Sequence, residues 1–306
     1  MIRKFLLIGL ISGLIFTGCN KDENNGVTPM TGSHTLILNF QGLEMLQNGF
    51  HYEGWAIING QPVSTGKFNV GAGGNLVDLN GNSIANNSFS VTDDLSSATA
   101  VVISIEPNND PDPAPANTHI LSGNVTSSSA MLSVSGAASF GNDFSTAMGT
   151  YILATPTNGS NTNENSGIWF LDLSSGSPAL GLTLPTLPAG WMYEGWAVIN
   201  GMPVTTGKFT DPAAADNSAP FSGAQAGPPF PGEDFLQSAP AGLTFPTDLS
   251  GGKGVITIEP SPDDSPNPFT LKPLVGDIPA NATDHTDYIM TNNSAAFPTG
   301  SATIQQ

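Results

Sequence analysis

Short apolar runs separated by turn residues dominate the hydrophobic pattern of the chain. Residues 35–40, 52–58, 63–68 and 101–105 are rich in β-branched and aromatic side chains, and each run is followed within two residues by Gly, Pro or Asn. Such runs are typical of β-strands. No stretch of a dozen residues places apolar side chains at the i, i+3, i+4 and i+7 spacing of an amphipathic helix. The pattern therefore predicts an all-β protein of the β-sandwich type.

A segment of seventeen residues occurs twice, starting at Tyr52 and again at Tyr193, and fourteen of its positions are identical. In both copies an Asn-Gly pair separates two apolar runs. Because this pair adopts positive φ angles at low cost, it predicts a type I′ hairpin. We expect a structural role for the repeated aromatic and proline residues, namely Tyr52, Trp55, Pro62, Phe68, Tyr193, Trp196, Pro203 and Phe209.

A second repeated block has the sequence Val-Ile-Ser/Thr-Ile-Glu-Pro and starts at Val102 and at Val255. The two blocks lie farther apart in the second copy, which places an insertion within residues 211–232. Residues 144–153 and 297–304 are also similar, so the duplication extends to the end of each copy. The sequence predicts two tandem β-sandwich (Ig-like) domains, at residues 34–155 and 167–306, joined by a flexible linker at residues 156–166.

The N-terminus has the layout of a secretory signal peptide. A basic start is followed by twelve apolar residues at 5–16 and by Thr-Gly before Cys19. The apolar run is shorter than the about 20 residues that a membrane-spanning helix needs. Small residues before a cysteine resemble the lipobox of bacterial lipoproteins. We therefore predict a signal peptide at residues 1–18, a lipid anchor at Cys19 and a flexible tether at residues 19–33. An ordinary signal peptide with an incidental cysteine is the alternative.

The tether begins with Asn-Lys-Asp-Glu at residues 20–23. A lysine followed by acids at this position resembles the export signal that sends lipoproteins to the cell surface in some Gram-negative groups. This resemblance favours an outer-membrane lipoprotein at the cell surface. A solvated tether on the periplasmic face of the membrane is the alternative.

The charge and the cysteine content exclude one class of partner and two kinds of site. Seven Lys and Arg residues against 25 Asp and Glu residues give a net charge of −18, which repels the phosphates of nucleic acids. Cys19 is the single cysteine, which excludes an internal disulfide and a cysteine-rich zinc site. Nucleic acid is therefore not an expected partner.

Acidic residues cluster in the loop that follows each Glu-Pro block. Carboxylates grouped in this way can supply the oxygen ligands of Ca²⁺. The alternative is that Glu-Pro ends a strand and that the aspartates stabilise solvated turns. No other cofactor is predicted. The Ca²⁺ candidates are Glu106, Asp110 and Asp112 in the first copy, and Glu259, Asp263 and Asp264 in the second.

The sequence contains none of the motifs GxSxG, HExxH, GxxxxGK[ST] or GxGxxG, so we do not expect an enzyme. The aromatic residues of the repeat allow two interpretations. Tyr52 and Trp55 can stack on sugars, or they can pack inside the sandwich, and two packed sheets favour the second interpretation.

The repeat resembles the C-terminal domain of the anti-sigma-K factor family over the central part of each copy. The pattern Tyr-x-x-Trp, Gly-x-Pro-Val and Gly-x-Phe carries the resemblance, and a strand ending in Glu-Pro follows it. In that family the domain lies outside the cytoplasm and is joined through a membrane helix to a sigma-binding part. The chain has no counterpart of either, so the resemblance implies a fold and a compartment but no sigma-factor binding.

These observations together predict a non-catalytic cell-envelope lipoprotein. We expect its duplicated domains to bind a protein or polysaccharide partner at the cell surface. The alternative is a structural or signalling lipoprotein that faces the periplasm and relays the state of the envelope to a membrane partner.

Overall fold

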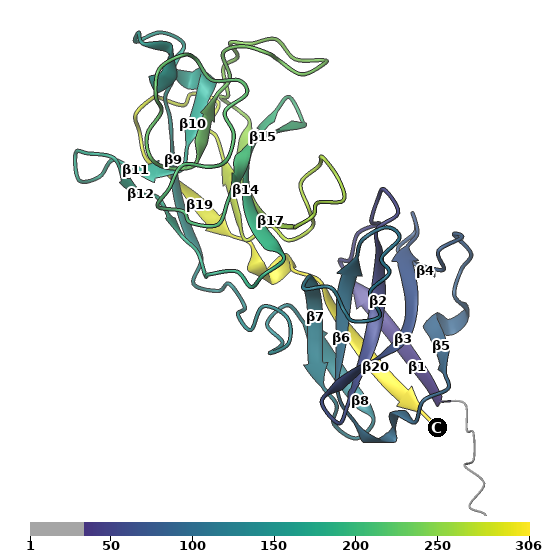
Figure 1. Ribbon diagram of the computed structural model, residues 1–306. Coiled ribbons are helices and arrows are strands. Elements are labelled where there is room, and N and C mark those ends of the chain that lie inside the picture. The colour runs from purple at the N-terminus through teal and green to yellow at the C-terminus, as the bar shows by residue number, and fades with distance from the viewer. Residues whose placement is uncertain (1–33) are drawn as a thin grey trace, which may run out of the picture. The chain divides into compact units, whose positions relative to one another are not determined.

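Strands form nearly all the regular structure of the protein, as the computed structural model shows for residues 34–306 (Figure 1). The described residues contain no α-helix, which confirms the predicted all-β fold. None of their helical turns is long or apolar enough to cross a membrane. Short 3₁₀ turns are Ala85–Asn87, Leu95–Ser97, Pro156–Asn158, Glu164–Ser166 and Ser294–Ala296. The predicted signal peptide, Cys19 and the tether at residues 19–33 lie outside the described residues.

Nine strands form the first sheet, in the order β4-β3-β2-β6-β7-β8-β20-β1-β5. All neighbours in this order are antiparallel. The strands are β1 (His34–Gln41), β2 (His51–Ile58), β3 (Gln61–Val70), β4 (Leu76–Val77), β5 (Ser88–Val91), β6 (Ala98–Glu106), β7 (His119–Asn124), β8 (Ser129–Ser133) and β20 (Thr299–Gln305).

The second sheet has the order β15-β14-β17-β18-β19-β9-β10-β16, and β13 also pairs with β9. A separate two-stranded sheet joins β11 to β12. The strands are β9 (Met148–Leu153), β10 (Gly167–Trp169), β11 (Leu171–Asp172), β12 (Ala179–Leu180), β13 (Leu182–Thr183), β14 (Trp191–Ile199), β15 (Met202–Phe209), β16 (Gly232–Asp234), β17 (Lys253–Pro260), β18 (Leu274–Asp277) and β19 (Tyr288–Asn292).

The two copies exchange their last strands. Strand β20 ends the second copy, yet it lies between β8 and β1 of the first sheet, where its yellow arrow stands among purple and blue strands in Figure 1. Strand β9 ends the first copy and pairs with β19 and β10 of the second sheet. Each sheet is therefore completed by a strand of the other copy. The repeat in the sequence identifies the copies but carries no information about which sheet each last strand joins.

Residues 134–147 and 293–298 carry the chain from one sheet to the other. They contact each other through the rings of Phe144 and Phe297, which lie 5.5 Å apart. Beside this contact Asn292 Nδ2, at the end of β19, donates hydrogen bonds to the Phe144 and Ala147 carbonyls at 2.8 and 2.9 Å. The segment predicted as a linker, residues 156–166, instead packs beside the second sheet. Its Thr157 is 2% exposed, and the Thr157 N–H donates to Asp234 Oδ2 at 2.8 Å.

The repeated motif forms the same bulged hairpin in both copies. Asn59 and Gly60 have φ angles of 51° and 77°, as the predicted type I′ turn requires, and the second copy has the same turn at Asn200-Gly201. The strand register shifts at Gly54/Trp55 and at Gly195/Trp196. A Cβ atom on Gly54 would lie 2.6 Å from Thr65 Oγ1, so the bulge requires glycine there.

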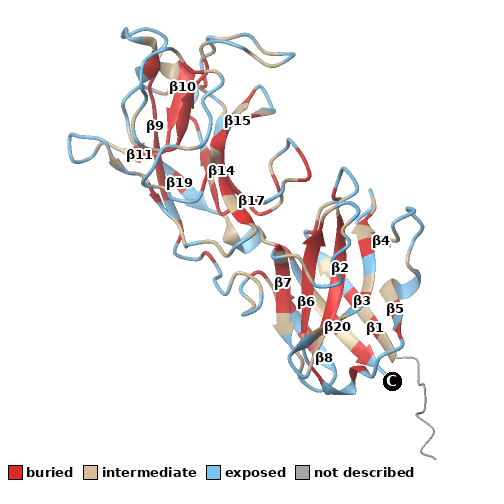
Figure 2. Cartoon of the chain, viewed as in Figure 1, coloured by how far each residue is buried: buried red, intermediate tan, exposed pale blue. Residues whose placement is uncertain are grey.

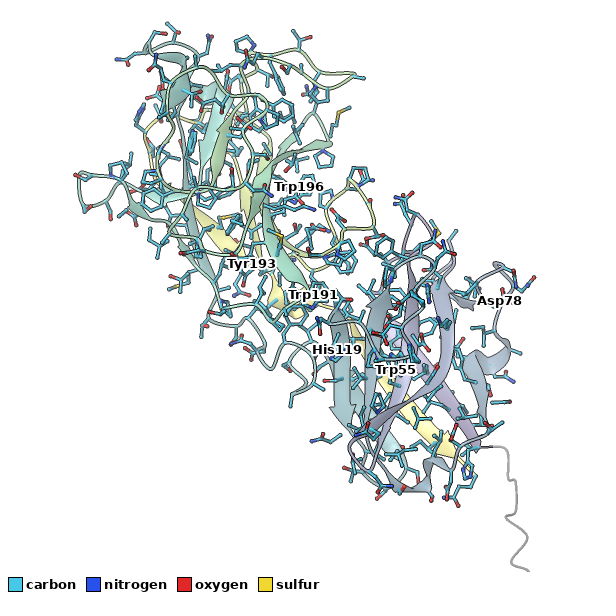
Figure 3. The ribbon with its side chains drawn as sticks, in the orientation of Figure 1. Trp55, Asp78, His119, Trp191, Tyr193 and Trp196 are labelled. Carbon is cyan, nitrogen blue, oxygen red and sulfur yellow. The ribbon has the colours of Figure 1, made fainter. Side chains whose placement is uncertain are left out.

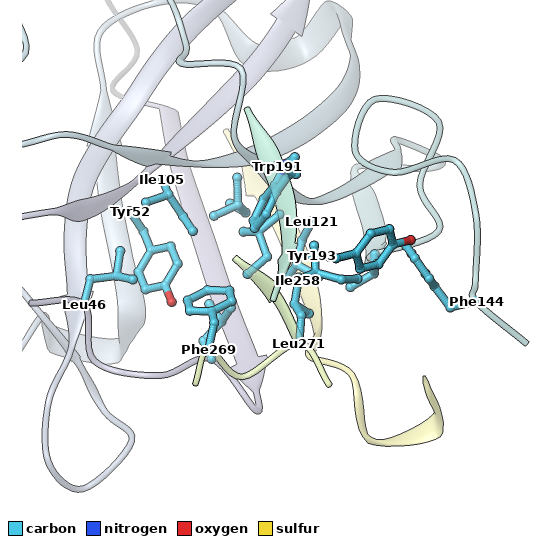
Figure 4. Packing of buried hydrophobic residues seen from close by; sticks show 14 of the residues in the cluster. Leu46, Tyr52, Ile105, Leu121, Phe144, Trp191, Tyr193, Ile258, Phe269 and Leu271 are labelled. Atoms are coloured by element: carbon cyan, nitrogen blue, oxygen red, sulfur yellow. The ribbon is translucent and has the colours of Figure 1, made fainter. Parts of the chain in front are cut away.

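Each sheet curls so that its apolar face lies inside a β-sandwich. In the first sheet, Phe68 of β3 packs against Phe40 of β1 and Phe89 of β5, with ring centroids 5.5 and 5.6 Å apart. Figure 2 shows that β2, β6 and β14 are buried along most of their length. Most of the buried apolar side chains form one cluster, which includes Tyr52 of the first copy and Trp191 of the second (Figure 4).

Candidate functional site

The tryptophan of the repeated motif is buried in both copies. Trp55 lies on β2 and Trp196 lies on β14, and each is 3% exposed (Figure 3). The indole N–H of Trp55 donates to Ser104 Oγ at 2.8 Å. The indole N–H of Trp196 donates to Thr257 Oγ1 at 2.8 Å. Because a buried indole needs an acceptor, each hydrogen bond fixes the motif hairpin to the neighbouring strand, β6 or β17.

Tyrosine and phenylalanine of the motif pack on each other inside the sandwich. Tyr52 stacks on Phe68 at 5.5 Å, and Tyr193 stacks on Phe209 at 5.6 Å. The Tyr52 and Tyr193 side chains are fully buried, and their hydroxyls donate to backbone carbonyls. Pro62 and Pro203 are half-buried and follow the type I′ turns. None of these rings presents a face on which a sugar could stack.

A glutamate and a lysine of the motif form a further contact that the sequence analysis did not single out. Glu53 is 4% exposed, accepts a hydrogen bond from the Ser64 hydroxyl and lies 3.5 Å from Lys67 Nζ. The lysine neutralises a carboxylate that would otherwise be costly to bury. Both residues are identical in the two copies, and this identity is the signal by which they could have been found.

In the second copy the same pair gains an aspartate. Glu194 accepts a hydrogen bond from the Thr205 hydroxyl at 2.5 Å and lies 3.7 Å from Lys208 Nζ. Lys208 Nζ is also 2.6 Å from Asp263 Oδ2. Burial raises the pKa of Glu194, although Thr205 and Lys208 oppose this effect.

The glutamate of each Glu-Pro block closes the loop that follows it. Glu106 is 1% exposed, accepts from the Ser104 hydroxyl and accepts from the Ala116 N–H at 3.1 Å. Glu259 is completely buried, and its Oε1 accepts from the Phe269 N–H at 2.9 Å. Each glutamate thus bonds to the backbone ten residues later, which explains why both copies retain it.

Burial raises the pKa of Glu259 to about 8, and the nearby acids Glu194 and Asp263 also raise it. Burial raises the pKa of Glu106 as well. Glu259 therefore holds a proton at neutral pH and behaves as a neutral carboxylic acid. Its Oε2 atom is buried and accepts no hydrogen bond, consistent with protonation of this side chain.

Two of the predicted Ca²⁺ ligands of the second copy do meet. Glu259 and Asp263 join Glu194, with one oxygen of each within 4.8 Å of the others. Lys208 already supplies a positive charge to this cluster, through its contacts with Asp263 and Glu194. A divalent cation could be held by the three carboxylates only if the ammonium of Lys208 moved away. Among the described residues, no other acids come together in this way.

The remaining Ca²⁺ candidates lie apart from that cluster. Asp110 accepts from the Asp112 N–H at 2.9 Å, and Asp112 accepts from the Ala114 N–H at 2.9 Å, as aspartates do in turns. Asp264 is buried and accepts from the Gln47 N–H at 2.9 Å, so it contacts the first copy. These contacts show turn-stabilising and packing roles for the aspartates.

The two copies differ most on the outer faces of their sheets, which point away from the core. On strands β8, β20, β1 and β5 every second residue points away from the core, because Leu36, Leu38 and Ala302 between them point into it. We call this surface the open face. Met131 on this face is 78% exposed. The open face comprises alternate residues of β1 (Thr35 to Gln41), β20 (Thr299 to Gln305) and β8 (Ser129 to Ser133), with Ser88 and Ser90 of β5.

The corresponding surface of the second sheet is covered where β9 and β10 pair. The Ile37–Thr303 pair of the first sheet has its counterpart in the Trp169–Ile152 pair of the second. Trp169 and Ile152 are each 4% exposed and belong to a separate apolar cluster, against which Phe230 of the insertion packs. The indole N–H of Trp169 is bonded to Asp234 Oδ1 at 2.8 Å. The insertion thus covers in one sheet what stays open in the other.

Comparisons with known proteins identify no relative of the chain. The chain matches no protein-family model, no curated protein and no solved structure.

Proposed function

We propose that the protein is a non-catalytic cell-envelope lipoprotein, exposed at the cell surface through a lipid anchor at Cys19, which binds a protein or polysaccharide partner. The proposal combines the N-terminal pattern of residues 1–19 with the duplicated β-sandwich fold. Its alternative is a lipoprotein that faces the periplasm and has a structural or signalling role. The resemblance of each copy to the extracytoplasmic domain of anti-sigma-K factors is compatible with both.

The observation that carries the proposal is the position of the repeated polar side chains. Glu53, Glu106, Glu194 and Glu259 are each at most 4% exposed, and they bond to neighbouring hydroxyls, lysines or backbone N–H groups. Groups used in this way hold strands and loops together. What the protein offers to solvent is a scaffold with a broad polar face, which suits a binding module better than a catalyst.

Protease treatment of intact cells, beside lysed cells, tests the proposal. We expect the chain to be digested on intact cells, as detected by immunoblot, and the Cys19→Ala variant to leave the membrane fraction. Protection until the cells are lysed would contradict surface exposure and would favour the periplasmic alternative. Retention of Cys19→Ala in the membrane fraction would contradict the lipid anchor.

A further inference from the structure

The open face is free of charged side chains, although the chain has 32 charged residues and a net charge of −18. Its outward positions on β1, β5, β8 and β20 carry hydroxyl or amide groups at every place except Ile37 and Met131. The cross-strand register arranges these groups in rows. Met131, Ser301 and Asn39 form one row, and Ser129, Thr303 and Ile37 form the next.

Met131 stands between two shallow hollows. One hollow of about 310 Å³ is lined by Asn39, Thr299 and Ser301 together with Met131. The other, of about 330 Å³, lies on the side of β7 and is lined by Asn124 and small residues. Neither lining contains a charged residue. The open face thus combines a flat array of hydrogen-bonding groups with an exposed thioether and uncharged depressions beside it.

The fold does not require this composition. At the equivalent pair of positions the second sheet has Trp169 and Ile152, and the insertion covers them. The first sheet has Ile37 and Thr303 there, and both are only half-buried. A pair of positions that one copy buries under apolar contacts is therefore left partly open to solvent in the other.

The chemistry of the open face matches an uncharged polymer rich in hydroxyl groups. Hydroxyls and amides both donate and accept hydrogen bonds, so they can pair with sugar hydroxyls in either sense. The face contains no Trp, Tyr or Arg, which are the residues that dominate binding energy in protein interfaces. A second copy of the chain or an anionic polymer would bring negative charge toward an acidic protein. We infer that the open face binds a neutral polysaccharide. This inference rests on the proposed function and assigns it a surface and a ligand class.

Affinity electrophoresis in native gels tests the inference. The full mature chain is run through gels that contain dextran, mannan, a mixed-linkage β-glucan or galactomannan, with alginate as the anionic comparison. We expect at least one neutral polymer to retard the chain and alginate to leave its mobility unchanged. Met131→Glu and Ser301→Glu place a charge on the open face and should weaken the retardation about tenfold.

Ile289→Glu is the matched control. Ile289 occupies the position on β19 that Met131 occupies on β8, and it is 75% exposed, yet it lies outside the open face. It should bind like the unmodified chain, and the melting temperatures of all three variants should agree within a few degrees. Failure of every neutral polymer to bind would overturn the inference, and so would equal binding by Met131→Glu, Ser301→Glu and Ile289→Glu. Neither result would affect the proposed function, because digestion on intact cells is measured separately.

Discussion

The two copies of the repeat have kept their interior and changed their outer face. Both retain the buried tryptophan, its hydroxyl acceptor, the glutamate–lysine pair and the glutamate that closes a loop. They differ where β1 and β20, or β10 and β9, meet solvent. In the first sheet this face is polar and open, and in the second it is apolar and covered by the insertion. The residues that hold the fold together are therefore common to both copies, whereas the residues of this outer face are not.

A second difference concerns charge. In the first copy Lys67 lies near one glutamate, whereas in the second copy Lys208 contacts both Glu194 and Asp263. The second copy thus brings three acids close to one ammonium. Protonation of Glu259, whose pKa burial raises to about 8, limits the repulsion among them.

Removal of residues 299–306 should have the largest effect. It takes β20 from between β8 and β1, so the first sheet loses a central strand although the deletion lies at the end of the second copy. We expect hydrogen exchange to rise sharply in β1 and β8. A chain lacking only Gln306, which lies beyond β20, is the control. Faster exchange confined to the second sheet would contradict the exchange of strands.

Truncation of the motif tryptophans should be the next largest effect. Trp55→Ala and Trp196→Ala each leave a cavity and remove the hydrogen bond that Ser104 Oγ or Thr257 Oγ1 accepts, and each should lower the free energy of unfolding by about 3–5 kcal/mol. Urea denaturation measures this loss. The control, Met131→Ala on the open face, should change the free energy of unfolding by less than about 0.5 kcal/mol. A loss below about 1 kcal/mol in one copy would show that the copies are not structurally equivalent.

Glu259→Gln should change the pH dependence of stability. The pKa of Glu259 in the folded protein, about 8, lies above its ordinary value of 4.5, so the folded state binds the proton more tightly. Its stabilising contribution is complete below about pH 4.5 and is lost as the pH rises through about 8. Glu259→Gln should remove this loss, as urea denaturation across that pH range would reveal. An unchanged slope would contradict a protonated Glu259, and Asp112→Asn serves as a control that removes an exposed carboxylate.

Calcium should have the smallest effect. Because the ammonium of Lys208 already contacts Glu194 and Asp263 in this cluster, we expect millimolar Ca²⁺ to leave the melting temperature unchanged. Differential scanning calorimetry measures this directly. A rise in the melting temperature that Glu259→Gln abolishes would instead establish a calcium site in the second copy.

Much of the fold could be predicted from the sequence. The apolar runs and the Asn-Gly turns located the hairpins, since these features depend on local geometry alone. The strand exchange could not be predicted. Residues 144–153 and 297–304 are similar, so either segment could complete either sheet as far as the sequence shows. The choice depends on the path of residues 134–147 and 293–298, which have no regular pattern.

The candidate site was predicted in part. The acids near Glu-Pro were found, but their role was not, because the hydrogen bond from the Ala116 or Phe269 backbone to the glutamate depends on how the loop closes. Glu53 and Lys67 were missed although both belong to the repeat. The open face has no motif at all, because it is assembled from four strands that lie far apart in the sequence.

Cross-linking of paired cysteines tests the exchange of strands most directly. In a Cys19→Ala background, Thr35→Cys is combined with Gln305→Cys, its register partner, or with Ala154→Cys, the position that would face Thr35 if each copy kept its own last strand. We predict that the 35–305 pair forms a disulfide within one chain and that the 35–154 pair does not, as judged on non-reducing gels. A disulfide between positions 35 and 154 would contradict the account.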